Sequence, residues 1–300
     1  MKVFIKVMCS IICVGILFVV IGISTGAKLN YSFFEHKITI DDSKTEKISK
    51  NLSDFNKINI DVDYSNKIEI IEGDENKIDL SYYKIKNKPN LEYSIENNEL
   101  TIKSNHIKSF INFVPSTNNK QFIKVYVKKG TEIENLKISS DCSDVSISNI
   151  NSKTINVNCD YGDISVNNIK NLNSLILDAN AGNINTSDLS SNSIQMTNDY
   201  GDVTLSNINC PEINIDVDCG DVNIDNSVLN KSTIDNSYGD VTISNLPETE
   251  DYYNYKLKCD FGDVSINGQN IDNDYTKINT NDENIIKISN NCGDIDINTK

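Results

Sequence analysis

The sequence predicts an all-β protein, a single-stranded parallel β-solenoid of about 19 residues per coil with two strands per coil, after an N-terminal transmembrane helix. Three observations carry this prediction. A short Gly-Asp segment recurs at nearly constant spacing through the second half of the chain. Apolar residues alternate with polar ones on both sides of each such segment. An apolar run near the N-terminus is long enough to span a bilayer.

The recurring segment is clearest in copies such as DYGDISVNNI from Asp160 and DYGDVTLSNI from Asp199. Eight copies align on one pivot position, occupied by Ser143, Gly162, Gly182, Gly201, Gly220, Gly239, Gly262 and Gly293. Such a period indicates stacked, near-identical units. Glycine suits a tight turn with positive φ, and adjacent Asp or Asn suits hydrogen bonds to the turn backbone.

Three columns of mostly apolar residues emerge when the copies are aligned on the pivot. Five residues before it stand Ile138, Val157, Leu177, Met196, Ile215, Ile234, Leu257 and Ile288. Two residues after it stand Val145, Ile164, Ile184, Val203, Val222, Val241, Val264 and Ile295. Four residues after it stand Ile147, Val166, Thr186, Leu205, Ile224, Ile243, Ile266 and Ile297. Period-two alternation puts these residues on one face of each strand, so stacked coils should share one narrow core.

The chain divides into four predicted segments. Residues 1–27 form a membrane anchor, and residues 28–52 form a polar juxtamembrane linker. Residues 53–137 are β-rich but irregular, and we interpret them as a broader start of the same stack or as a small sheet that caps it. Residues 138–300 hold the regular repeats.

Two connections among the repeats are longer than the others, at residues 247–253 and 268–284, and we expect both to be surface loops. The last coil ends at Lys300 with no covering element after it in the sequence. An uncovered coil exposes backbone hydrogen-bonding groups, which predicts self-association through the C-terminal coil as one alternative.

The anchor prediction depends on Lys2 and Lys6, which precede an apolar run from Val7 to Ile23. Flanking lysines favour a cytoplasmic N-terminus. This predicts a single-pass cell-membrane protein with its C-terminal domain extracellular. A cleaved signal peptide with its site at residues 25–27 is the alternative. Both interpretations place the remaining chain outside the cytoplasm.

The chain carries a formal net charge of −15, and all of its basic residues are lysines. An acidic chain without arginine is a poor match for nucleic acid, so we expect no nucleic-acid partner. The charge is uneven. Residues 1–137 hold 20 lysines and 17 acids, a net of +3, whereas residues 138–300 hold 8 lysines and 26 acids, a net of −18.

Acidic residues recur two positions before and one position after the pivot. Hard oxygen ligands suit calcium, and the candidate residues are Asp160, Asp163, Asp199, Asp202, Asp218 and Asp221. The alternative, which we favour, is turn chemistry and solubility without a metal. Repulsion between unit charges about 5 Å apart in water is only about 0.8 kcal/mol, which a turn tolerates. No cofactor is expected.

Cysteines and aromatic residues occupy two further columns. One residue before the pivot stand Cys142, Cys219 and Cys292, together with Tyr161, Tyr200, Tyr238 and Phe261. Three residues before it stand Cys159 and Cys259, and Cys210 lies outside both columns. Alternation predicts that both columns face inward, so a sugar-binding strip of aromatic rings is less favoured than core stacking. Cys142 and Cys159 would lie roughly 8 Å apart, too far for a disulfide.

Enzymatic function is disfavoured. The histidines are His36 and His106, and no Ser/His/Asp or Cys/His set can be built around the repeats. A catalytic site usually separates the pKa values of its groups in distinct surroundings, whereas the same Asp pair recurs here in nearly every coil.

Three features in order carry a family resemblance. They are FNKINIDVDYSNKIEIIEG from Phe55, NNELTIK followed by FIKVYVKKGTEIENLKIS, and the recurring GDVTISNI-type strands. Over roughly residues 53–300 the chain resembles the bacterial putative adhesin family of β-strand-repeat domains of unknown function. The resemblance implies a membrane segment followed by a β-solenoid, adhesion or an envelope-stress role, and no catalytic residues.

The leading functional hypothesis is a non-catalytic surface interaction protein that meets an unknown protein or glycan outside the cytoplasm. One alternative is a cell-envelope stress sensor or regulator that works through a membrane partner. The other is a calcium-binding or self-assembling surface rod.

Overall fold

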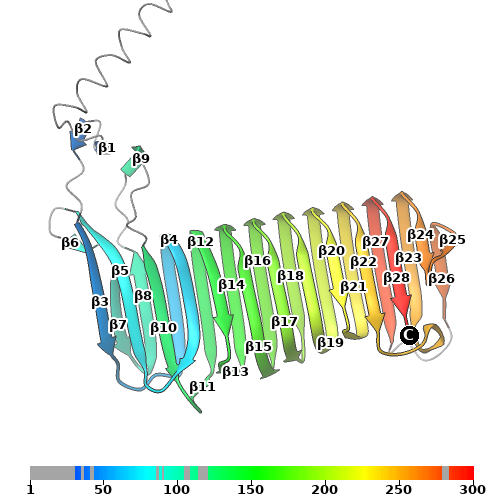
Figure 1. Ribbon diagram of the computed structural model, residues 1–300, viewed down its shortest axis with the longest axis horizontal. Helices are drawn as coiled ribbons and strands as arrows, with labels where there is room; N and C mark the ends of the chain where they lie inside the picture. The colour runs from blue at the N-terminus through cyan, green and yellow to red at the C-terminus, as the bar shows by residue number, and fades with distance from the viewer. Residues whose placement is uncertain are drawn as a thin grey trace, which may run out of the picture.

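The computed structural model of this chain describes residues 31–34, 37–40, 44–85, 88–89, 91–104, 109–113, 121–278 and 284–300. In these residues the protein is all-β apart from one short 3-10 turn, and its strands stack into a rod (Figure 1). None of the helical structure in these residues is long and apolar enough to cross a membrane. The predicted anchor over residues 1–27 lies outside the described residues.

The strands fall into three groups along the chain. The N-terminal group is β1 (Tyr31–Phe34), β2 (Lys37–Ile40), β3 (Lys44–Asn51), β4 (Lys57–Gly73), β5 (Lys77–Ile85), β6 (Lys88–Pro89), β7 (Leu91–Glu96), β8 (Glu99–Ser104), β9 (Ser109–Phe113) and β10 (Phe122–Lys128). The central group is β11 (Glu132–Ile133), β12 (Asn135–Ser148), β13 (Asn151–Ser152), β14 (Thr154–Tyr161), β15 (Ile164–Leu172), β16 (Ser174–Ala181), β17 (Ile184–Ser191), β18 (Ile194–Tyr200), β19 (Val203–Cys219), β20 (Val222–Asp225), β21 (Val228–Tyr238) and β22 (Val241–Leu246). The C-terminal group is η1 (Glu250–Tyr252), β23 (Asn254–Phe261), β24 (Val264–Ile266), β25 (Gln269–Ile271), β26 (Asp274–Lys277), β27 (Ile285–Cys292) and β28 (Ile295–Thr299).

From β12 to β22 each coil pairs in parallel with the next, about 19 residues further along the chain. Val157 on β14 pairs with Leu177 on β16, and Ile164 on β15 pairs with Ile184 on β17. Every member of the three predicted core columns is buried. The solenoid prediction is therefore confirmed in its all-β, stacked-coil form, with its core where the alternation placed it.

The first corner of each coil lies at the pivot glycine, where successive coils approach most closely. Gly201 has φ +136°, and a Cβ atom on it would lie 2.2 Å from the carbonyl oxygen of Gly182 on the neighbouring coil. Gly201 also donates its N–H to the carbonyl of Cys219 on the next coil, at 2.9 Å. Only glycine satisfies both the left-handed backbone and the contact between coils.

The second corner uses asparagine in place of glycine. Asn168, Asn207 and Asn226 all have positive φ, which asparagine tolerates better than most residues. The Asn226 amide donates to the Asn207 side-chain oxygen at 2.7 Å, so this corner also carries a ladder between coils.

The N-terminal part both begins the stack and caps it. Strand β4 forms a full coil that pairs in parallel with β12, and β8 and β10 pair in parallel with its two halves. Antiparallel strands then close the end, with β7 on β8 and β5 on β10. Residues 57–128 thus hold both a further coil of the stack and antiparallel strands at its end.

Strand β3 changes the predicted linker over residues 28–52. It pairs antiparallel with β5 along its whole length, so residues 44–51 belong to the main sheet. Its lysines and its position at the edge explain why alternation did not reveal it, since edge strands often carry charge that discourages further pairing. In the same segment β1 pairs with β2 and with β9 in a separate small sheet.

The C-terminal coils do not stack in sequence order. Strand β27 lies between β21 and β23, and β28 lies between β22 and β24. The last coil in the sequence is therefore enclosed on both sides, which corrects the expectation that it is uncovered. The outermost coil is β23–β24, and the antiparallel strands β25 and β26 cover it. Residues 269–271 and 274–277, expected as loop, form this cover.

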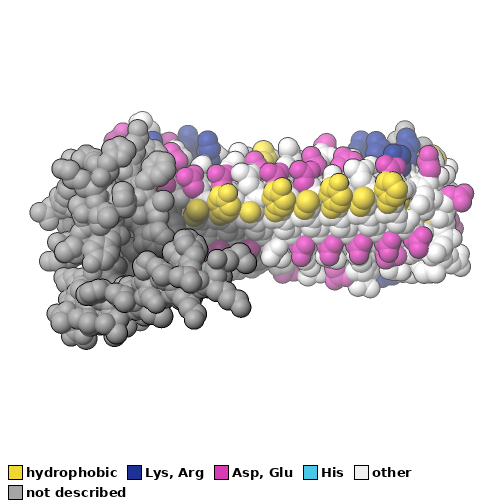
Figure 2. Space-filling view, turned by 90° about the horizontal axis from the view of Figure 1, so that it is seen from above, with side chains coloured by type: hydrophobic (Ala, Val, Ile, Leu, Met, Phe, Trp, Pro, Cys, Tyr) yellow, Lys and Arg dark blue, Asp and Glu magenta, His cyan; other side chains and the backbone are white. Residues whose placement is uncertain are grey.

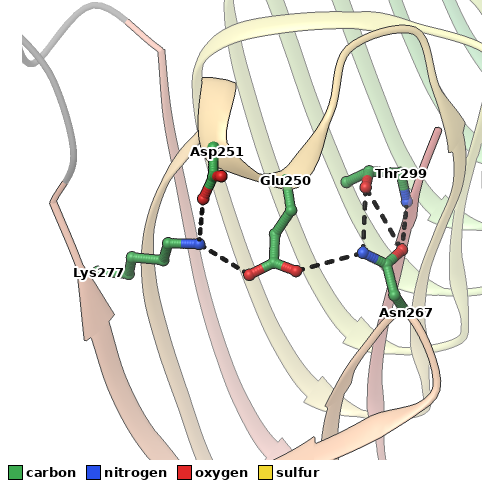
Figure 3. Close-up of polar contacts among 5 residues, drawn as sticks. All are labelled: Glu250, Asp251, Asn267, Lys277 and Thr299. Atoms are coloured by element: carbon green, nitrogen blue, oxygen red, sulfur yellow. Dashed lines mark hydrogen bonds and ion pairs between the residues drawn. The ribbon is translucent and has the colours of Figure 1, made fainter.

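We call this departure from sequence order the coil exchange. A polar network holds the exchanged coils together (Figure 3). Lys277 on β26 contacts Glu250 Oε1 at 2.8 Å and Asp251 Oδ1 at 3.0 Å. Asn267 donates to the other oxygen of Glu250 at 3.3 Å and accepts the Thr299 N–H at 2.9 Å. The connection after β22, the cover strand and the end of β28 are held together in this way.

The close approach at the first corner predicts that alanine in place of a pivot glycine destabilises the protein more than alanine in place of a glycine in open space. Gly201→Ala should lower the free energy of unfolding by more than about 3 kcal/mol, because a Cβ would strike a neighbouring carbonyl as well as straining the backbone. Gly130→Ala is the matched control, because Gly130 has φ +83° and nothing within 4 Å of its would-be Cβ. It should lose only about 1–2 kcal/mol. Urea unfolding of the full chain in detergent would measure both, and equal losses would contradict the steric argument.

Candidate binding surface

The strand alternation breaks just before each pivot glycine. Cys159 is buried and Tyr161, two residues later, is 63% exposed, although unbroken alternation would put both inside. In the pairing of β14 with β16, Cys159 and Tyr161 both have partners but Asp160, which lies between these two residues, has none. The chain therefore bends at Asp160. The column one residue before the pivot therefore faces outward, and the expectation that it stacks in the core is wrong.

The column three residues before the pivot fills the inside of the corner. Its members Asn198, Asn236 and Asn290 are buried, as are Cys159 and Cys259. Asn198 donates to the carbonyls of Gly201 at 2.8 Å and Gly182 at 3.0 Å, and thereby joins two coils. These side chains occupy the space that the aromatic residues were expected to fill.

The outward column forms a line along the rod, which we call the aromatic row. In stacking order its members are Cys142, Tyr161, Ala181, Tyr200, Cys219, Tyr238, Cys292 and Phe261. The four rings are 60–75% exposed, and the small residues between them are partly exposed. Figure 2 shows this row as a line of hydrophobic side chains with acidic side chains on either side.

The rings alternate strictly with small residues because of the coil exchange. In sequence order Tyr238 and Phe261 would occupy adjacent coils, but the exchange places Cys292 between them. The backbone register extends the pattern in the other direction, where Cys142 pairs with Tyr64. The ring-bearing positions thus recur at every second coil, about 9.6 Å apart. In the described residues no ring of the row contacts another ring.

One flank of the row is a ladder of acids one residue after the pivot. The Asp202 carboxylate accepts the backbone N–H of Asp221 at 2.9 Å, and Asp221 accepts that of Asp240 at 2.9 Å. Asp163 accepts the N–H of Asn183 at 2.8 Å, and Asn183 accepts that of Asp202 at 2.9 Å. Each side chain therefore accepts a hydrogen bond from the backbone of the next coil through one oxygen, so this ladder has a structural role between coils.

The other flank carries acids two and four residues before the pivot. Asp160, Asp199 and Asp218 lie two before it, and Asp178 and Asp216 lie four before it. Burial, together with the charges of Asp235, Asp218 and Asp199, raises the pKa of Asp216. Burial and the charges of Asp199 and Asp160 likewise raise the pKa of Asp178. This face is therefore strongly negative.

The candidate metal ligands do not gather into a compact site. In the described part of the chain, no group of three or more His, Cys, Asp or Glu side chains is arranged to hold a metal ion. Asp163, Asp202 and Asp221 form the ladder, and Asp160, Asp199 and Asp218 form part of the opposite flank, with the aromatic row between them. Calcium binding stays the less favoured alternative, to be decided by measurement.

Six cysteines lie in the described residues, and five of them belong to the two columns. Cys159, Cys259 and Cys210 are buried, whereas Cys142, Cys219 and Cys292 are partly exposed. Cys210, which lies outside both columns, is also buried, and this burial raises the pKa of its thiol to about 11. All six are free thiols in the structure. His36 and His106 lie outside the described residues.

Rigid strands, a repeated exposed surface and repeated polar flanks define a class of protein, a β-solenoid that presents one extended surface. The family follows from the sequence. The chain belongs to the Toastrack DUF4097 family, whose model matches residues 55–298. This confirms the family resemblance found in the sequence. A comparison with curated proteins returns no match.

The chain is also similar to solved structures, at low sequence identity. A "putative adhesin" from Parabacteroides distasonis is 11% identical with a TM-score of 0.45, covering 85% of this chain and 98% of its own. A "putative adhesin" from Parabacteroides merdae is 13% identical with a TM-score of 0.44, covering 86% and 97%. A "putative lipid binding protein" from Parabacteroides distasonis is 13% identical with a TM-score of 0.41, covering 85% and 96%.

The ladder of acids one residue after the pivot predicts that stability depends on the hydrogen bonds of these side chains and not on their charge. Asp221→Ala should destabilise the protein by about 1 kcal/mol, because the Asp240 N–H loses its acceptor. Asp221→Asn should be neutral or stabilising, since Asn183 already serves in the same ladder. In thermal unfolding, each of the three proteins should have the same melting temperature with calcium as with a chelator. A calcium-dependent rise that Asp221→Asn abolishes would contradict this account.

The raised pKa of Asp216 predicts stabilisation by mild acid. A carboxyl whose folded-state pKa lies above its ordinary 3.8 contributes most below that value and loses its contribution as the pH rises through the folded pKa. Asp216→Asn should therefore raise stability at pH 7 and have little effect near pH 4.

The opposite control is Asp225→Asn. Hydrogen bonds from the side chains of Asn245 and Ser244 lower the pKa of Asp225, so its charged form is favoured in the folded protein. This variant should lose stability at pH 7. Denaturant midpoints measured from pH 4 to pH 7 would test both signs, and a parallel response of the two variants would refute the assignment.

Proposed function

We propose that this chain is a membrane-anchored, extracytoplasmic, non-catalytic binding protein, an adhesin-like rod that meets its partner along the aromatic row. The observation that carries the proposal is the exposure of four aromatic rings in one line on a rigid scaffold. Exposed apolar side chains in a contiguous line are a hallmark of interaction surfaces. Four of the seven large hydrophobic side chains that are exposed in the described residues belong to this row.

The scaffold supports binding better than catalysis. The corner geometry repeats from coil to coil, so no single position has the distinct surroundings that separate an acid from a base. The row also lies on hydrogen-bonded strands, which hold its members at fixed spacing. A partner that repeats along its own length would meet this surface in many equivalent registers.

The proposed location depends on the apolar run from Val7 to Ile23 and its flanking lysines. An anchor there would present the rod from the outer face of the membrane. The alternative of an envelope sensor stays a prediction, and it would require a membrane partner. Self-association through the last coil loses its motivation, since that coil is enclosed.

Adhesion by whole cells tests the function. Bacterial cells that express the full chain should adhere to immobilised cell-wall material, and the variant Tyr161→Ser/Tyr200→Ser/Tyr238→Ser should lose at least about 90% of that adhesion, because several contacts are removed together. Tyr252→Ser, a 40% exposed tyrosine outside the row, should adhere like the parent protein. Protease added to intact cells should digest the rod of every variant. Adhesion that is indifferent to the row, or a rod shielded from protease, would sink the proposal.

A further inference from the structure

The geometry points to an extended β-1,4-linked polysaccharide without net negative charge as the ligand of the aromatic row; this inference rests on the proposed function. The row is straight and periodic, so its ligand should be a polymer with a flat apolar face that repeats at the same interval. From Tyr161 to Phe261 the row crosses six coil steps, or about 29 Å.

The spacing of the rings fits such a chain. Rings at every second coil lie about 9.6 Å apart. In an extended β-1,4-linked chain, alternate sugars turn the same face to one side, so a given face recurs once per disaccharide at a similar interval. The apolar face of each such sugar can then stack on a tyrosine or phenylalanine ring. The partly exposed Ala181, Cys219 and Cys292 leave room for the sugars between stacking positions.

The flanks fit the hydroxyl groups of a sugar chain. The ladder uses one oxygen, Oδ1, of carboxylates such as Asp202 and Asp221, and these residues are exposed. Sugar hydroxyls are donors that such acceptors can bind. On the other flank, Asp218 and Asp260 are also exposed acceptors.

Charge selects among polysaccharides and weighs against a second copy of this chain. Residues 138–300 carry 8 lysines against 26 acids, a net of −18. Uronic-acid polymers would be repelled by the flanks, and so would the same face of another molecule. A neutral chain avoids this repulsion and keeps the hydrogen bonds.

A polyproline II peptide is the main competing ligand, because its three-residue repeat of about 9.3 Å also matches the row. Such peptides offer carbonyl acceptors and, where they are rich in proline, few donors. The flanks supply mainly carboxylate acceptors, so the two partners are mismatched. The row also lies on the outside of a corner, without the aromatic-lined groove that such peptides usually enter.

The test is calorimetry on the full chain in detergent with defined oligosaccharides. The hexamer of β-1,4-linked N-acetylglucosamine should bind with a Kd below about 1 mM, and the dimer, which cannot bridge two rings, should bind at least about 10-fold more weakly. The α-linked maltohexaose and polygalacturonate should not bind measurably. Proline-rich peptides form a further arm.

Substitutions in the row distinguish a requirement for periodic rings from unspecific hydrophobic binding. Tyr200→Ser should weaken hexamer binding about 10-fold, and Tyr200→Phe should preserve it, because the ring makes the contact. The double variant Ala181→Tyr/Tyr200→Ala keeps the number of exposed rings but moves one by a coil, and it should lose as much as Tyr200→Ser. Tyr252→Ser should bind normally, and circular dichroism would confirm that every variant is folded.

The outcomes are decisive in both directions. Hexamer binding that depends on length and on ring position supports the inference. No hexamer binding, equal binding by the shifted-ring variant, or binding of proline-rich peptides alone overturns it. If cell adhesion still depends on the row in those cases, the proposed function stands and only the glycan assignment fails.

Discussion

The structure depends on how closely successive coils approach at the pivot glycines. A Cβ on Gly220 would lie 2.0 Å from the carbonyl oxygen of Gly201, and the same contact recurs at the other pivot glycines of the stack. This contact sets the coil spacing at the corner, and the parallel ladders on both sides then continue that spacing into the core columns. Buried side chains such as Asn198 inside the corner, and the aspartate ladder outside it, add further hydrogen bonds between coils at the same place.

The coil exchange follows from the near-identity of those contacts. A coil that offers Gly, Asp and two strands of alternating residues can stack on any other such coil, so local pairing does not dictate sequence order. The segments that connect the coils decide the order in which the coils stack. The network of Glu250, Lys277, Asn267 and Thr299 holds the exchanged arrangement, and β25 and β26 cover the outermost coil. The exchange closes the C-terminal end and also restores the alternation of large and small side chains along the row.

The sequence predicts the positions of side chains well along the strands and poorly at the corners. Along straight strands, alternation holds, which is why columns such as Val157 and Ile164 were predicted correctly. At the corner the chain bends at residues such as Asp160, and alternation then misplaces Tyr161. One signal was available: the outward column mixes Ala181 with Tyr200, a volume difference that a close-packed core column rarely accepts. The exchange was out of reach, because neither periodicity nor spacing records which coil lies beside which.

The acidic flanks are harder to explain by structure alone. Asn183 takes part in the same ladder as Asp202, so the hydrogen bond does not require a charge. On the other flank, burial and then the charges of neighbouring acids raise the pKa of Asp178 and Asp216, which means that their ionised forms oppose folding at neutral pH. Charge beside an exposed apolar line keeps like surfaces apart and limits unspecific association. It also narrows the ligands that the row can accept, so the same residues that weaken the fold slightly would define what the surface binds.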